Sequence, residues 1–99
     1  MVAIPKPQTF RSEAWRRAVA ALPCCVCNAE PCQAAHRNEG KGTGLKTDDV
    51  FTFPLCPPCH AEYDQGKTLS REQKRSLADR WILETVRRLA LDGVLKVTK

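Results

Sequence analysis

The chain has 99 residues, a formal net charge of +5 and six cysteines. This length suits a single domain over residues 1–99, in which apolar burial barely outweighs the entropy lost on ordering the chain, so an additional cross-link or metal is expected. The positive charge suits a polyanionic partner without establishing one. The sequence shows neither the pattern of a secretory signal peptide nor a bilayer-spanning stretch, which predicts a cytoplasmic protein that does not bind membranes.

A first helix is predicted over about residues 10–22. Thr9 or Ser12 can cap its start, and Pro23 ends it. Apolar residues recur along it at helical spacing, namely Trp15, Ala18, Val19 and Leu22. This periodicity predicts an amphipathic helix that places Trp15 in the core.

Two short strands are predicted on either side of a glycine-rich loop. Residues 33–37 can form the first strand, and residues 50–55 are β-branched and aromatic, which is typical of a strand. Alternate glycines in residues 38–49 indicate a loop. This loop has neither the spacing of a P-loop nor the order of a dinucleotide-binding motif, so nucleotide binding is disfavoured.

Two more helices are predicted after the second strand. The dipeptide Pro57-Pro58 fits the first turn of a short helix, because the backbone N–H groups of that turn have no partner within the helix and their absence costs nothing. This helix is predicted over about residues 59–65. A longer helix follows over about residues 70–92. The spacing of Ser70 and Gln73 is that of a capping box at its start.

The cysteines form two CxxC pairs, Cys24 with Cys27 and Cys56 with Cys59. In a reducing cytoplasm, such pairs favour a metal over disulfides, and a CxxC turn presents two thiolates to one tetrahedral zinc ion. Cys25 and Cys32 remain, and Cys32 can replace a member of the first pair. A redox role for the second pair is disfavoured because no βαβ pattern surrounds it. The spacing predicts a structural zinc site that joins the first and second helices.

A second group of polar residues has the chemistry of a divalent-cation site. His60 and Asp64 are one helical turn apart, which places them on the same helix face. His36 lies on the first predicted strand and Asp49 just before the second. If the strands pair and pack on the short helix, all four can converge on Mg²⁺ or Mn²⁺. Each also has a structural alternative, since His36 can be a hydrogen-bonded structural histidine and Asp49 a loop cap.

The order of these residues resembles a known family. The chain is similar to the zinc-supported HNH (ββα-metal) nucleases in the order of its motifs. That order is a CxxC pair, then Ala35-His36, a glycine-rich loop, and Pro54-Leu55-Cys56 followed by Cys59-His60. Within that superfamily the chain resembles small phage and prophage proteins, including recombination-associated nucleases. The resemblance covers about residues 23–65.

This resemblance implies a small α+β fold with a ββα-metal core, flanked by the N-terminal and C-terminal helices. It also implies a DNA endonuclease in the cytoplasm of a bacterial host, with structural Zn²⁺, catalytic Mg²⁺ or Mn²⁺, and a recombination or replication protein as a further partner. His36 would be the general base, Asp49 an orienting residue or ligand, and His60 with Asp64 the metal ligands. Many relatives have an Asp or His ligand where this chain has Ala35, so His36 can instead be that ligand.

Basic residues near the predicted site can hold the DNA backbone without reading its sequence, and the candidates are Arg37, Lys41 and Lys46. A rival hypothesis from another class is a zinc-binding module that binds nucleic acid or protein without catalysis. It explains the cysteines and the charge but not the His60 and Asp64 pair. Oligomeric state and the preferred DNA form are left open by the sequence.

Overall fold

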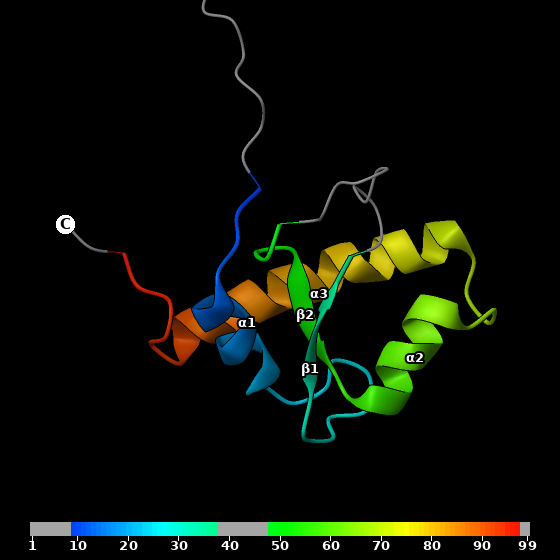
Figure 1. Cartoon of the computed structure of the whole chain (residues 1–99), viewed down its shortest axis with the longest axis horizontal. Coiled ribbons are helices and arrows are strands. Elements are labelled where there is room, and N and C mark those ends of the chain that lie inside the picture. The colour runs from blue at the N-terminus through cyan, green and yellow to red at the C-terminus, as the bar shows by residue number, and fades with distance from the viewer. Residues whose placement is uncertain (1–8, 38–47, 98–99) are drawn as a thin grey trace, which may run out of the picture.

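The computed structural model of the chain describes residues 9–37 and 48–97. Its elements, in chain order, are α1 (Glu13–Ala20), β1 (Gln33–His36), β2 (Thr52–Leu55), α2 (Pro57–Gln65) and α3 (Arg71–Leu91). The two strands form an antiparallel hairpin, which confirms the predicted α+β class. In Figure 1 the hairpin stands between α1 on the left and α2 on the right, with α3 crossing behind it. None of the described helices combines the length and apolar character needed to cross a bilayer.

The hairpin has two faces with different partners. Its register pairs Gln33 with Leu55 and Ala35 with Phe53, and side chains alternate between faces along each strand. Ala35 belongs to the larger apolar cluster, which α2 and α3 complete: Cys24, Ala35, Phe53, Leu55, Cys56, Tyr63 and Ala78. Ala34, on the opposite face, packs against the smaller apolar cluster of Val19, Leu22 and Leu89. We call these the α2 face and the α1 face of the hairpin.

Three aromatic rings fix the α2 face in place. The ring of Phe53 on β2 lies 5.3 Å from that of Tyr63 on α2 and 5.2 Å from that of Trp81 on α3. Tyr63 and Trp81 are 6.0 Å apart, which closes the triangle. Edge-on and tilted ring pairs at these distances add to the stabilisation from burial, so this trio joins three elements that are distant in sequence.

The first helix is shorter at both ends than the predicted span of about residues 10–22. It begins after Ser12, whose hydroxyl accepts a hydrogen bond of 3.0 Å from the backbone N–H of Trp15, so Ser12 is the N-cap rather than Thr9. The residues before the cap are bonded instead to the hairpin: the N–H of Phe10 donates to the Asp48 carboxylate, and the N–H of Asp49 donates to the Phe10 carbonyl. Trp15 packs against the smaller apolar cluster, as its periodicity predicted.

The other helices follow local sequence rules closely. Pro57 occupies the first turn of α2, which ends where the N–H of Gly66 donates to the Glu62 carbonyl. At the start of α3, Ser70 and Gln73 form both hydrogen bonds of the predicted capping box. The strands are shorter than predicted, since β2 begins at Thr52 rather than at residue 50.

Candidate functional site

Four of the six cysteines gather between the first CxxC turn and the start of α2. The Sγ atoms of Cys24, Cys27, Cys56 and Cys59 all lie within 4.8 Å of one another. The sulfur of Cys27 is 3.5 Å from that of Cys56 and 3.8 Å from that of Cys59. Four thiolates around a tetrahedral zinc ion, each about 2.3 Å from it, stand about 3.8 Å apart. The cluster therefore fits a structural metal such as zinc, as the two CxxC pairs predicted.

The local backbone favours a thiolate at Cys24. Burial raises the pKa of the Cys24 thiol, but hydrogen bonds from the backbone N–H groups of Cys27, Cys56 and Val26 outweigh it and bring the pKa to about 6. For Cys59, burial and then the neighbouring sulfurs raise the pKa. Four sulfurs this close together, two of them buried, cannot hold four negative charges without a cation, so this chemistry also favours a bound metal.

Cys25 and Cys32 lie beside the cluster but outside it. Burial raises the pKa of Cys25 to about 12 and that of Cys32 to about 11, so both are neutral thiols. The Cys32 thiol donates to the carbonyl of Ala29 at 3.2 Å. The structure thus selects one of the ligand sets that the spacing left open, and Cys32 does not replace a member of the first pair.

His60 and Asp64 form a pair on α2, on the α2 face of the hairpin. The His60 Nε2 lies 3.2 Å from the Asp64 carboxylate, and its Nδ1 is 2.6 Å from the Gln33 Oε1 on β1. An amide oxygen accepts, so Nδ1 carries the proton in this contact. Gln33 thereby orients the ring with Nε2 toward Asp64, which is the way a second residue commonly prepares a metal-binding histidine. Sequence reasoning missed Gln33, because a polar residue at a strand start carries no motif.

His36 and Asp49 form a second pair on the α1 face. The His36 Nε2 is 2.8 Å from the Asp49 Oδ1, and the Asp49 side chain is fully buried. The same carboxylate accepts a 2.7 Å hydrogen bond from the Ser12 N–H and has ion pairs with Arg11 at 3.3 Å and Arg16 at 3.2 Å. Asp49 therefore links the hairpin to the N-terminal helix, and it lies where an orienting residue for His36 would lie.

These contacts set the charge of Asp49. Burial raises the pKa of its carboxyl, but the His36 hydrogen bond, the Ser12 N–H and the charges of Arg11 and Arg16 outweigh that effect. The pKa consequently lies below its ordinary value, and the buried group is a carboxylate.

From the sequence we expected the two pairs to converge, but in the structure they are apart. His60 contacts Gln33 at the start of β1, whereas His36 stands at its end, about 10 Å further along a strand. Gln33 and His36 are three residues apart, so their side chains leave opposite faces of the hairpin. Within residues 9–37 and 48–97, the four cysteines are the one group of three or more such side chains placed to share an ion. Ala35 is fully buried in the core between the pairs.

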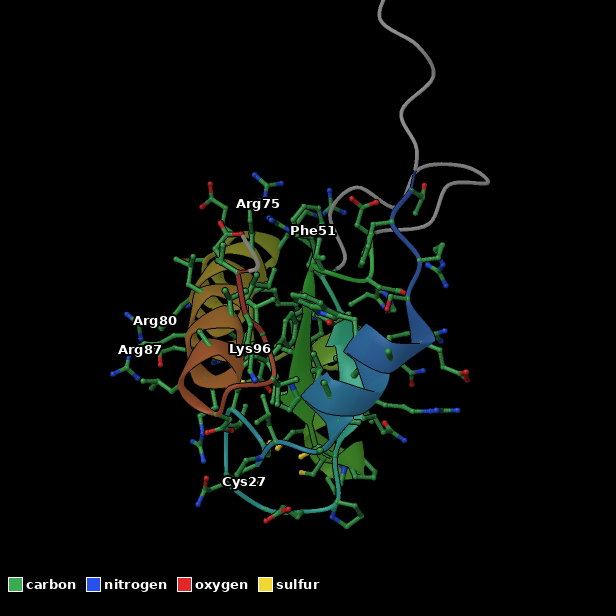
Figure 2. The ribbon with its side chains drawn as sticks, turned by 90° about the vertical axis from the view of Figure 1, so that its left-hand side faces the viewer. Cys27, Phe51, Arg75, Arg80, Arg87 and Lys96 are labelled. Carbon is green, nitrogen blue, oxygen red and sulfur yellow. The ribbon has the colours of Figure 1, made fainter. Side chains whose placement is uncertain are left out.

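The candidate DNA contacts differ in their placement. Arg37 forms a 2.8 Å ion pair with Asp79 on α3, so it connects β1 to α3. Lys41 and Lys46 lie outside the described residues. The solvent-facing side of α3 carries further cations, including Arg80 and Arg87, which point away from the helix in Figure 2.

Fold and site together define a small α+β protein with a four-cysteine cluster able to hold a metal ion. The chain belongs to the family described as "Protein of unknown function (DUF968)", whose profile matches residues 1–77. Searches among curated proteins and among solved structures returned no match.

Proposed function

We propose that this protein is a metal-dependent DNA endonuclease of HNH type, which hydrolyses phosphodiester bonds in phage- or prophage-associated DNA processing or recombination. One observation carries the proposal. The hairpin leads directly into α2, where His60 follows the cluster residue Cys59 and lies 3.2 Å from Asp64. A zinc-clamped β-β-α unit with a ligand pair on its helix is the arrangement that the sequence resemblance implies.

The pair fits a small divalent cation. Two neighbouring ligands of an octahedral Mg²⁺, each about 2.1 Å from the ion, stand about 3 Å apart, and the His60 Nε2 and Asp64 oxygen are 3.2 Å apart. Gln33 holds the ring so that Nε2 faces the carboxylate. When bound, Mg²⁺ or Mn²⁺ would supply positive charge to a phosphate oxygen and to the leaving oxygen. His60 and Asp64 would position it, with the remaining positions left to water and phosphate.

His36 remains the candidate general base in this proposal. Asp49 engages Nε2, so Nδ1 is the nitrogen that would take a proton from water, while the buried carboxylate orients the ring. The same pairing is common in histidines that act as bases. In this structure, however, His36 is on the α1 face, away from the His60 pair.

That separation favours a second candidate function, a zinc-binding module that binds nucleic acid or protein without catalysis. In such a module the His36–Asp49 pair would serve only to join α1 to the hairpin. The formal charge of +5 suits nucleic acid under either hypothesis.

A nuclease assay distinguishes the candidates. The purified protein, His36→Ala and His60→Ala are incubated with supercoiled, linear and single-stranded DNA in Mg²⁺, Mn²⁺ or chelator. Ion-dependent cleavage that both variants lose supports the endonuclease with His36 as base. Cleavage lost only in His60→Ala supports an endonuclease whose base is another group. Binding without cleavage in any ion overturns the nuclease proposal and supports the module.

A further inference from the structure

A cavity of about 240 Å³ lies between the first cysteine turn, the end of β2 and the second half of α3. Its walls include Pro23, Cys25, Pro54, Trp81, Glu84 and Arg87. Neither the His36–Asp49 pair nor the His60–Asp64 pair lines it. Its volume is below the roughly 300–1,000 Å³ of sites for drug-sized ligands, so it suits one planar ring system.

The apolar walls are held rigidly. Trp81 is only partly buried, and its ring packs against Phe53 and Tyr63, which fixes its orientation. On the other side, the carbonyl of Pro54 accepts a 2.9 Å hydrogen bond from the N–H of Cys25, which joins the strand to the cysteine turn. A ring that enters between these walls meets a preformed aromatic and apolar surface and displaces water from it.

The mouth of the cavity is charged. Glu84 lies about one turn before Arg87 and Arg88 on α3, and Arg88 is ion-paired with Asp92 at 3.3 Å. Arg87 is exposed, and within the described part of the chain neither it nor Arg80 forms an ion pair. The two arginines are seven residues apart, which is about 10 Å along a helix, and both point outward in Figure 2.

We propose that this cavity takes one unstacked nucleobase from an unpaired stretch of the nucleic-acid substrate. The base packs against Trp81 and the prolines, its phosphate contacts Arg87, and the Glu84 carboxylate accepts from an amino group on the base edge. Arg80 contacts the backbone further along. The combination of aromatic wall and adjacent free cation is what single-stranded nucleic-acid sites share. This inference rests on the proposed DNA function and adds a preference for single-stranded, gapped or branched DNA over intact duplex.

The test uses the full chain loaded with zinc, in chelator-free buffer without Mg²⁺ or Mn²⁺. The chain has two tryptophans, so Trp15→Phe leaves Trp81 as the reporter. Fluorescence of Trp81 and anisotropy of labelled DNA are followed with a duplex and with the same duplex carrying a short unpaired gap. We expect the gapped DNA to quench Trp81 and to bind about fivefold or more tightly than the duplex.

Arg80→Ala is the matched control for Arg87→Ala, since each removes one exposed cation from α3, and of these two residues Arg87 alone lines the cavity. Arg87→Ala should abolish the preference for gapped DNA, and Arg80→Ala should weaken both DNA forms equally. Equal affinity for both forms, unchanged Trp81 emission, or identical behaviour of the two variants overturns the inference and leaves the proposed function intact. If no DNA form binds, both proposals are overturned. If Trp15→Phe folds poorly, the anisotropy of labelled DNA with the wild-type chain still measures the preference for gapped DNA over duplex.

Discussion

His36 and Asp49 share a 2.8 Å hydrogen bond on the face of the hairpin that packs against α1, while His60 occupies the other face beside Gln33. The four candidate site residues thus form two pairs on opposite faces of the hairpin. Each pair can be altered without touching the other, so the role of each can be measured independently.

Replacing Asp49 with Asn should destabilise the protein by about 2 kcal/mol or more, because a buried carboxylate with several partners is lost and its two arginines keep their charge. Urea unfolding measures this change. Asp48→Asn is the control, since the neighbouring carboxylate has an exposed hydrogen bond to the Phe10 N–H and should cost much less. Equal losses in the two variants would contradict a special role for Asp49.

The stabilisation from Asp49 should depend on pH. Because the folded-state pKa is lowered, the unfolded chain binds a proton more readily, so this contribution is full above the unfolded value of about 3.9 and is lost as pH falls through the folded pKa. The stability difference between wild type and Asp49→Asn should therefore shrink in acid. Both proteins share the pH dependence of zinc binding, so the difference isolates Asp49. A difference that stays constant down to low pH would rule this out.

Removal of the cluster metal should cost most of the folding free energy, because a domain this small depends on such a cross-link. We expect one zinc per chain by elemental analysis, and loss of cooperative thermal unfolding on chelation or in Cys56→Ser. Cys25→Ser should keep its zinc, since Cys25 is a neutral thiol outside the cluster. Zinc loss in Cys25→Ser with retention in Cys56→Ser would refute the ligand set.

A second ion should bind at His60 once zinc is saturated. Titration with Mn²⁺, followed by calorimetry, should show a site that His60→Ala abolishes and Gln33→Ala weakens about tenfold to a hundredfold, because Gln33 orients the ring. Gln65→Ala, at the exposed end of the same helix, should bind Mn²⁺ normally. Absence of any second site in the wild type would remove the basis for the His60–Asp64 role.

Placing an acidic residue at position 35 should not create a better metal site. Ala35 is fully buried among Phe53 and Tyr63, so Ala35→Asp would bury an unpaired charge and cost about 3 kcal/mol or more. Thermal unfolding measures this cost, with Ala35→Ser as a milder control of similar size. A stable Ala35→Asp protein with improved Mn²⁺ affinity would show that the position opens toward the ion.

Features governed by short-range rules were predictable from the sequence. The capping box of Ser70 and Gln73, the prolines at the start of α2 and the two CxxC turns depend on residues within one turn of each other. Such short motifs have the same local geometry in any fold. The start of α1 differs from the predicted one because Phe10 and Ser12 bond to Asp48 and Asp49, which are distant in sequence.

The arrangement of the site was harder to predict because it depends on which hairpin face each side chain occupies. Pairing of the strands was anticipated, but convergence of His36 with His60 also required both to lie on one face. Gln33 and His36 are three residues apart on β1, so their side chains lie on opposite faces. This could be deduced from the sequence once the strand bounds were known. The cations around Asp49 were not predictable, since Arg11 and Arg16 belong to no motif and their ion pairs join them to a carboxylate that is distant in sequence.

The short helix α1 has only 8 residues, too few to persist by itself in water. Its capping residue Ser12 also donates its N–H to Asp49, so the helix start and the hairpin end depend on one carboxylate. We therefore expect α1 to form late in folding, after the hairpin has closed. Ribosomal synthesis produces α1 first, but its stable conformation must wait until residue 49 has emerged.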